Sequence, residues 1–573
     1  MKKFRELNFK YPFLIALLAA ILFIPFLGYV HLFDWDEINF AEAAREMLIL
    51  EDYTRVHIRF LPFWEKPPLF FWLQALSMKI FGVNEFAARF PNALCGMIML
   101  PTLYFIGKKL YNAKFGLIWA IVYMGSLFPS FYFQSGIIDP WFNFFIFLSL
   151  YFFILSYWKR SGFKDIELKY SHWIYLLIAA VFCGLAVLTK GPVAFLILCL
   201  CFFVFWVFKR FRMYVSVPQF LVFILTMIAV TFIWYGVETV KNGPWFIIEF
   251  IEYNYRLFKQ PDAGHGGFFG YHFVVVFFGC FPASIFLIRG LFPQWHDFEH
   301  QKNFKFWMLI LFWVVLILFS IVKSKIVHYS SLSYFPLTYM ATVVLYQITK
   351  KRIAFRHTMR WGIRVIAAVI GLALFVLPFI GMHIEFIQEL VKDPFARANM
   401  NANPGWTGLE SITGLLLILT AYIGSAMLGR KKKMTGILVL FIGTAIVLKL
   451  SVLFTIKKIE AYSQLAAIEY YKAHADEDAY IQPIDHKTYA NLFYGKLRPE
   501  FAPEVEDYSD YEQRTAWENK LLKGDIDKPV YFISKNKSDR RLREAAEFGV
   551  KKIGEKNGFV FYKREPKYIF KGY

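Results

Sequence analysis

Residues 31–68 read HLFDWDEINFAEAAREMLILEDYTRVHIRFLPFWEKPP and follow the first long apolar run of the chain. This stretch gathers charges in a part of the chain where acidic residues are scarce: Asp34, Asp36, Glu37, Glu42, Arg45, Glu46, Glu51, Asp52, Glu65 and Lys66. Ionisable groups beside apolar segments are costly and tend to be functional. We predict that residues 31–68 form an outer loop that carries the reactive groups, and that the other segments build a cavity around it.

Hydrophobic residues make up 57% of the 573 residues, and charged residues only 19%. A soluble protein would have no interior for 67 phenylalanines, so most of the chain is predicted to face lipid. The formal net charge of +21 would suggest nucleic acid in a soluble protein. Here the basic residues cluster at the ends of apolar segments, where they meet anionic lipid head groups. We therefore expect membrane lipids as partners and no nucleic acid.

Apolar segments of about 20 residues recur through the chain and predict about thirteen transmembrane helices. They fall near 12–30, 86–107, 115–133, 139–157, 172–189, 192–208, 217–237, 271–291, 304–322, 330–347, 361–380, 409–428 and 434–455. The first is expected to be a retained helix, because no small-residue cleavage site follows it. If the N-terminus is cytoplasmic, every inner loop is basic, as the positive-inside rule requires. We expect a plasma membrane protein, in bacteria an inner-membrane one, with its C-terminal tail periplasmic.

The tail from residue 457 has more charge and shorter apolar runs than the preceding part. Residues 460–473 and 538–547 are predicted to be helices, the second with Ser538 as its N-cap. Residues 479–483, 529–534, 550–553 and 559–562 are predicted to be strands. The chain is thus expected to divide into a transmembrane domain, 1–456, and a small α/β domain, 457–573.

Asp36 and Glu37 open a segment with apolar residues at helical spacing. Asp34 and Glu37 match a capping box, which would make these acids no more than the start of an interfacial helix. That interpretation leaves Asp36 unexplained, and a carboxylate beside a cavity can act as a general base. Asp139, in GIIDPWF, either caps the following helix or is a second active-site carboxylate.

Basic residues on the outer side run against the charge bias of the loops, so phosphate recognition is a plausible role for them. The candidates are Lys66, Lys190, Arg256 and Lys325. For Lys66 the alternative is an interfacial charge pair with Glu65 before a helix that begins with proline. For Lys190 and Lys325 the alternative is an interfacial cation that reaches to the membrane surface.

The segment 238–270 is predicted to be a long outer loop in which glycines flank His265. Such a loop could close over a site. A lone histidine is more often structural or simply exposed, but with Glu65 it could bind a divalent cation, zinc or magnesium or manganese.

Four motifs together resemble a known family. They are DExxFAExAREM at 36–47, FWEKPPLFFWL at 63–73, LTKGP at 188–192 and the outer loop with Asp139. In this order they resemble the bacterial polyprenyl-phosphate sugar transferases of the GT-C fold, which include aminoarabinose–lipid A transferases and protein O-mannosyltransferase relatives. The resemblance covers roughly residues 10–345.

The resemblance implies a many-span fold and a lipid-phosphate sugar donor. It also implies Asp36 as the catalytic acid, Lys66 and Tyr329 as phosphate contacts, and Glu65 with His265 as a metal pair. The chain departs from the family in two places. Asn39–Phe40 stand where the aminoarabinose transferases usually have Arg-Tyr, and the stretch KIVHYSSLSYFP has His328 where the family more often has a Pro-Thr-type sequence.

The expected function is transfer of a sugar, with inversion, from a polyprenyl-phosphate donor to a lipid, glycan or protein acceptor outside the cytoplasm. Asp36, aided by Asp139 and Glu37, would activate the acceptor hydroxyl. One rival function is a transporter or flippase of lipid-linked sugars, which would place ionisable groups near the middle of the bilayer. A second rival is a scaffold built on the tail. Deleting residues 457–573 is expected to destroy a scaffold but to leave an enzyme its site.

Overall fold

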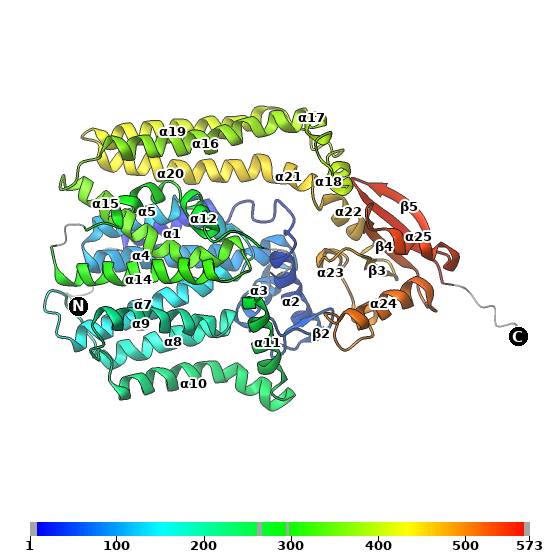
Figure 1. The fold of residues 1–573 in the computed structure, drawn as a ribbon, viewed down its shortest axis with the longest axis horizontal. Coiled ribbons are helices and arrows are strands. Elements are labelled where there is room, and N and C mark those ends of the chain that lie inside the picture. The colour runs from blue at the N-terminus through cyan, green and yellow to red at the C-terminus, as the bar shows by residue number, and fades with distance from the viewer. Residues whose placement is uncertain (1–8, 260–265, 294–296, 567–573) are drawn as a thin grey trace, which may run out of the picture.

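The computed structural model describes residues 9–259, 266–293 and 297–566. Long apolar helices form a bundle in which they run roughly parallel, as Figure 1 shows. At one end of the bundle lie α2 (Asp36–Leu50) and α3 (Leu69–Phe81), and beyond them a small domain that contains a β-sheet. The protein is therefore a multi-pass membrane protein with a C-terminal α/β domain, which confirms the predicted fold class.

Each expected apolar segment corresponds to a helix or to a bent pair of helices. These elements are α1 (Lys10–Phe23), α4 (Glu85–Leu110), α5 (Ala113–Met124) with α6 (Leu127–Phe131) and η2 (Tyr132–Gln134), α7 (Asp139–Arg160), α8 (His172–Lys190), α9 (Val193–Phe208), α10 (Val217–Asn242), α12 (Tyr271–Gly279) with α13 (Ala283–Gly290), α14 (Glu299–Ile321), α15 (Tyr334–Thr349), α16 (His357–Met382), α19 (Ile412–Gly429) and α20 (Lys433–Ser451). Within the described ranges, 8 helices are long and apolar enough to cross a membrane, or up to 10 with the bent pairs. The count of thirteen is not confirmed.

Two of the expected spans are broken by sharp bends. The axes of α5 and the α6–η2 segment differ by 80°, and those of α12 and α13 by 117°. Gly125 ends α5 and Pro282 precedes α13, and both residue types disfavour a continuous helix. Length and apolarity alone predicted full spans here, because they do not register a change of direction.

Helix α7 forms the centre of the bundle. In the most apolar stretch of α7, 83% of the residues are buried. In the corresponding stretches of α10 and α16, at the lipid-facing margin, only 17% are buried. Close packing on all sides leaves a helix little freedom to shift. Asp139, the first residue of α7, is therefore held on a rigid element.

The segment expected as a loop at 238–270 contains a helix instead. Helix α10 continues to Asn242, and α11 occupies Trp245–Lys259. The sequence WFIIEFIEYNYRLFK alternates apolar and polar residues at helical spacing, which favours an amphipathic helix. In Figure 1, α11 lies beside α2 and α3 at the end of the bundle.

The C-terminal domain has a four-stranded sheet in the order β3-β4-β6-β5. Its strands are β3 (Tyr480–Pro483), β4 (Val530–Lys535), β5 (Lys551–Lys556) and β6 (Phe559–Arg564), and its helices and turns are α21 (Lys457–Ala461), α22 (Leu465–His474), α23 (Ala490–Phe493), η7 (Pro499–Phe501), α24 (Tyr511–Lys523), α25 (Arg540–Glu544) and η8 (Ala545–Phe548). Strand β3 pairs parallel to β4, and the other pairs are antiparallel. All four predicted strands are confirmed. The predicted Ser538 cap is wrong, because Asp539 occupies the N-cap position of α25 and makes no side-chain cap bond.

Residue 457 falls inside a helical run, Lys433–Ala461, that includes a π-helical turn, η6 (Val452–Ile456). The domain also packs on the acidic segment. A single hydrophobic cluster combines side chains of α2 and α3 with side chains of the tail, among them Phe40, Phe71, Tyr471 and Phe493. The segment 31–68 is thus enclosed between the bundle and the C-terminal domain.

Candidate active site

A cavity of about 1950 Å³ opens where the bundle, the segment 31–68 and the C-terminal domain meet. The predicted site residues on its lining are Asp36, Glu37, Glu65, Lys66, Asp139, Lys190, Arg256 and Tyr329. They come from α2, the segment before α3, the first turn of α7, the end of α8, α11 and the 3₁₀-helix η4 (Val327–Ser333). Folding therefore brings together side chains that are far apart in the chain.

The two candidate carboxylates meet at one imidazole. Nε2 of His328 lies 3.4 Å from Oδ2 of Asp36 and 3.7 Å from Oδ2 of Asp139. Nζ of Lys190 lies 2.7 Å from the other oxygen of Asp139. Asp139 is almost fully buried, whereas about a third of the Asp36 side chain (33%) is exposed. Asp36 is thus the more exposed of these two carboxylates on the cavity lining, and Asp139 is the one paired with Lys190.

Glu37 anchors the helix that carries Asp36. Its Oε1 accepts hydrogen bonds from Nε of Arg89 (3.0 Å) and from the amide of Gly136 (2.5 Å). Its Oε2 accepts from Nη2 of Arg89 (2.8 Å) and from the amide of Phe33 (3.0 Å). Both oxygens of Glu37 are therefore occupied, and this geometry favours a positioning role over proton transfer.

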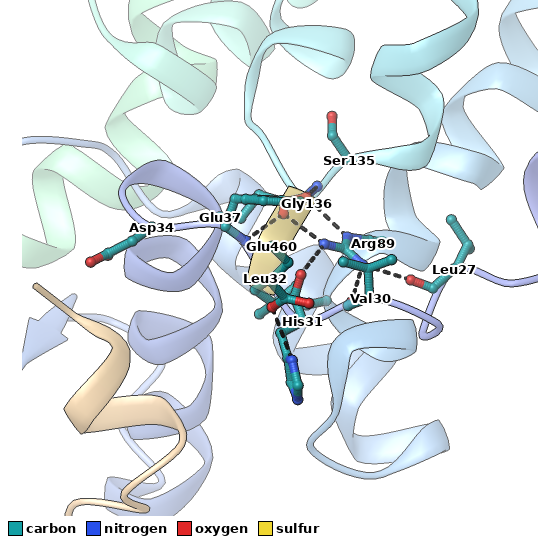
Figure 2. A network of polar contacts seen from close by, with 12 residues as sticks. Leu27, Val30, His31, Leu32, Asp34, Glu37, Arg89, Ser135, Gly136 and Glu460 are labelled. Carbon is teal, nitrogen blue, oxygen red and sulfur yellow. Dashed lines mark hydrogen bonds and ion pairs between the residues drawn. The ribbon is translucent and has the colours of Figure 1, made fainter. Parts of the chain in front are cut away.

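Arg89 extends this anchor to the backbone. Its guanidinium also donates to three carbonyl oxygens in the connection between α1 and α2: those of Leu27, Val30 and His31 (Figure 2). Burial tends to raise the pKa of Glu37, but the charge and hydrogen bonds of Arg89 outweigh it and hold the pKa below its ordinary value. Glu37 therefore stays ionised and keeps the start of α2 fixed against α4.

The capping-box interpretation of Asp34 and Glu37 is wrong. The N-cap of α2 is Trp35, and no side chain caps it. Asp34 points away from this turn in Figure 2, and its carboxylate accepts hydrogen bonds from the Thr488 hydroxyl and the Tyr489 amide of the C-terminal domain. Burial raises the pKa of Asp34 to about 6, against the lowering effect of these bonds.

Two further acids of the cluster are structural. Glu42 accepts two hydrogen bonds of 2.7 Å from Arg45. Glu46 accepts from the amides of Arg59 (2.7 Å) and Phe60 (2.8 Å), which form the turn between β1 (His57–Ile58) and β2 (Leu61–Pro62). Arg59 and Phe60 have φ values of 62° and 60°, an unfavourable region for residues other than glycine. The buried Glu46 carboxylate stabilises this strained turn.

The cations on the lining lie against aromatic rings. Nζ of Lys66 is 4.9 Å from the ring centre of Tyr253, and Cζ of Arg256 is 5.6 Å from the same ring. Nζ of Lys190 is 5.4 Å from the ring centre of Tyr329. The quadrupole of an aromatic ring attracts a cation that lies over its face. These side chains form a basic pole beside the Asp36 carboxylate.

Lys325 is placed differently from the other predicted cations. Its Nζ donates to the carbonyl oxygens at the end of α14, those of Phe319, Ser320 and Val322, at 3.0, 2.7 and 2.5 Å. It does not belong to the cavity lining. A lysine at a helix C-terminus satisfies the last carbonyls and the helix dipole, so Lys325 stabilises the end of α14.

Glu65 lines the cavity, but its expected metal partner His265 lies outside the described residues. Within residues 9–259, 266–293 and 297–566, no group of three or more His, Cys, Asp or Glu residues is arranged to hold a metal ion. The described residues therefore do not make up a complete metal site.

The C-terminal domain supplies one wall of the cavity. Its lining residues include Gln482, Asp485, His486, Lys487, Thr488, Tyr489, Tyr508, Arg514 and Arg541. The expectation that an enzyme would keep its site after deletion of residues 457–573 did not allow for this wall, and it stays a prediction to be tested. His328 is a residue of the site that was not among those predicted from the sequence. The available signal was its place in the KSKIVHY stretch, an outer segment with charges where an apolar run breaks.

Residues 65–235 match the family described as dolichyl-phosphate-mannose-protein mannosyltransferase. Curated relatives include the undecaprenyl phosphate-alpha-4-amino-4-deoxy-L-arabinose arabinosyl transferase of Wigglesworthia glossinidia brevipalpis, 27% identical over 57% of this chain and 58% of the relative. The enzyme of the same name from Photorhabdus laumondii is 25% identical over 55% of this chain and 56% of the relative. The match thus spans somewhat more than half the length of these relatives.

The crystal structure of ArnT from Cupriavidus metallidurans bound to undecaprenyl phosphate has the same fold. It matches with a TM-score of 0.75 and 17% identity, over 97% of this chain and 98% of that chain. The apo form of the same protein gives a TM-score of 0.75 at 16% identity, over 96% of this chain and 97% of that chain. These comparisons confirm the resemblance to polyprenyl-phosphate sugar transferases and the GT-C-like fold.

Proposed function

We propose that this protein is an integral-membrane glycosyltransferase that moves a sugar from a polyprenyl-phosphate donor to an acceptor outside the cytoplasm. The observation that carries the proposal is the pairing of a partly exposed carboxylate, Asp36, with a basic pole in one cavity at the end of the bundle. A base for the acceptor and cations for the phosphate are the two requirements of this reaction.

The donor phosphate would bind at the basic pole. Lys66, Lys190 and Arg256 supply positive charge, and Tyr329 supplies a hydroxyl. The same cavity is lined by apolar side chains of the membrane helices α9 and α14: Leu196, Ile197, Leu318 and Phe319. Apolar helix surfaces next to a cationic site fit a ligand with a charged head and a prenyl tail.

In the proposed reaction Asp36 takes the proton of an acceptor hydroxyl while the oxygen of that hydroxyl attacks the anomeric carbon of the donor sugar. The bond between that carbon and the phosphate oxygen breaks, and polyprenyl phosphate leaves. Lys66, Arg256 and Tyr329 would balance the charge that grows on the phosphate. One displacement by one nucleophile implies inversion at the anomeric carbon. Asp139, paired with Lys190, would hold that cation of the basic pole in a fixed position relative to Asp36.

The basic inner loops support an N-terminus in the cytoplasm and a cavity and C-terminal domain on the periplasmic side. Lipid A, a surface glycan and a protein side chain all remain acceptors compatible with this arrangement. A cysteine introduced at Ser509, on the cavity wall, should react with a membrane-impermeant thiol reagent in intact cells if this orientation holds.

A divalent cation, zinc or magnesium or manganese, bound by Glu65 and His265 would add positive charge beside Lys66. The proposed reaction uses Asp36 and the basic pole alone; of this pair only Glu65 is among the described residues. Chelation and re-addition of each metal, with transfer as the readout, tests this point.

The decisive experiment uses the full-length protein in proteoliposomes with a polyprenyl-phosphate sugar and candidate acceptors. Asp36→Asn should reduce transfer by about 10²–10⁴-fold, the usual contribution of a general base. Asp52→Asn is the matched control, because Asp52 belongs to the same segment and bonds locally to Thr54. Full activity of a correctly inserted Asp36→Asn protein would refute the proposal. Passage of the donor across the bilayer without sugar transfer would favour a flippase.

A further inference from the structure

His328 lies between the two carboxylates of the site but has no part in the proposed reaction. It lies on η4, between the end of α14 and the start of α15, and its Nε2 contacts an oxygen of Asp36 on α2 and of Asp139 on α7. Its side chain is largely buried, with 15% exposed. The pKa of a titratable ring at this junction depends on the charges of the groups around it.

The position of His328 is fixed by the packing of η4. The Ser331 hydroxyl donates to the carbonyl oxygen of His328 (2.5 Å) and accepts from Nδ2 of Asn143 on α7 (2.7 Å). The ring of Tyr329 lies edge-on to that of His328, with ring centres 5.5 Å apart. These bonds hold the backbone of His328 against α7, and its imidazole lies beside the two carboxylates.

The formal charges around His328 cancel in the protein alone. Asp36 and Asp139 contribute two negative charges, and Lys190 and Lys66 contribute two positive charges. His272 of α12 also lies near enough to interact with it. Burial lowers the pKa of His328; Asp139 and Asp36 oppose this effect, and Lys190 and Lys66 add to it. The imidazole is thus expected to be neutral near pH 7.

An anionic phosphate at the basic pole would change this balance. It would partly cancel the fields of Lys66 and Lys190 and leave Asp36 and Asp139 as the dominant neighbours. A negative environment favours the charged imidazolium, so the pKa of His328 should rise when the phosphate binds.

We propose that His328 is a positioning residue that takes up a proton when the anionic donor binds. As an imidazolium it would hold the Asp36 carboxylate beside Asp139, in place to take the proton of the acceptor hydroxyl. This inference rests on the proposed function, because it assumes that the phosphate binds at Lys66 and Lys190. It adds to that function a specific linkage between donor binding and pH, carried by one side chain.

The linkage can be measured by calorimetric titration of the full-length protein in detergent with a short-chain polyprenyl phosphodiester. A phosphodiester is the suitable probe because it does not itself titrate near neutral pH. Repeating the titration in buffers of different ionisation enthalpy gives the number of protons taken up. We expect a fractional uptake below one proton near pH 7, and a Kd that weakens with rising pH by up to about tenfold per unit.

In His328→Asn and His328→Gln the proton uptake and the pH dependence of Kd should both vanish. The matched control is His300→Asn, a buried histidine 3.2 Å from Asp165 at the other end of α14, which should keep the wild-type uptake. In transfer assays the His328 variants should show a larger fall in kcat than rise in donor KM, because Asp36 loses its partner. A purely structural role would not produce proton uptake in the wild type.

The outcomes separate the two proposals. Binding of the phosphodiester without proton uptake by the wild type, or equal uptake by the wild type and His328→Asn, would overturn the role of His328 and leave the transferase function standing. Absence of both phosphodiester binding and sugar transfer in the wild type would overturn the proposed function and this inference with it.

Discussion

Replacing Arg89 by methionine would leave the Glu37 carboxylate buried without its cation. The two side chains are 6% and 8% exposed, and Glu37 also depends on Arg89 for two of its four hydrogen bonds. Removing one partner of a buried ion pair costs about 3–5 kcal/mol, because the remaining charge is uncompensated. The three backbone carbonyls that Arg89 caps would lose their donor as well. We expect Arg89→Met to destabilise the protein by at least that amount.

The pH dependence of this loss follows from the lowered pKa of Glu37. Because the folded-state pKa lies below the unfolded value, the stabilisation by Arg89 is present above the unfolded pKa and is lost as the pH falls through the folded one. The defect of Arg89→Met should therefore shrink under strongly acidic conditions, where Glu37 is protonated in both proteins.

Equilibrium unfolding in mixed micelles, followed by tryptophan fluorescence, measures these differences. The double variant Glu37→Gln/Arg89→Met should be more stable than Arg89→Met alone, because it buries no unpaired charge. Arg352→Met is the matched control: Arg352 pairs with Asp297 at the surface, with 38% and 40% exposure, and should lose no more than about 1 kcal/mol. The reasoning is refuted if Arg89→Met and Arg352→Met unfold alike.

Three further predictions concern the cavity and its walls. Lys190→Met should abolish donor binding and lower stability, because it leaves Asp139 buried without its 2.7 Å partner; unchanged donor Kd would contradict this. The pKa of Asp34 is raised to about 6, so this residue stabilises the fold below its unfolded pKa near 4, and the stabilisation is lost as the pH rises through 6. Asp34→Asn should therefore remove up to about 3 kcal/mol of the pH dependence of the unfolding free energy, as unfolding titrations at several pH values would measure. Deletion of residues 457–573 should abolish transfer and expose the apolar surfaces of α2 and α3, as dye binding would report; a folded, active truncated protein would exclude a catalytic role for the tail.

Sequence patterns predicted the helices and strands well where local composition decides them. Long apolar runs predicted the long helices of the bundle, and short apolar runs predicted the four strands of the C-terminal sheet. Patterns were less informative where direction or partners matter. The 117° bend between α12 and α13 and the amphipathic helix α11 were not anticipated. A run of apolar residues reports burial in lipid or protein and contains no information on the path of the axis.

The candidate site shows the same division. Asp36, Lys66, Asp139, Lys190 and Arg256 could be selected from the sequence because charges are rare beside apolar segments, and all of them line the cavity. The same reasoning could not separate them from Lys325, whose charge serves the end of a helix. The charge of a side chain can be read from the sequence, but its role depends on the groups that folding places next to it.

The amino-acid sequence by itself therefore determined that this chain enters a membrane, where its helices lie and which charged residues are candidates for chemistry. Only the tertiary structure decided that Glu37 anchors α2 through Arg89, that His328 lies between Asp36 and Asp139, and that the tail forms one wall of the cavity. The physical reason is that helix formation and lipid exposure depend on neighbours along the chain. Pairing of buried charges depends instead on contacts between distant segments, which form only when the whole bundle packs.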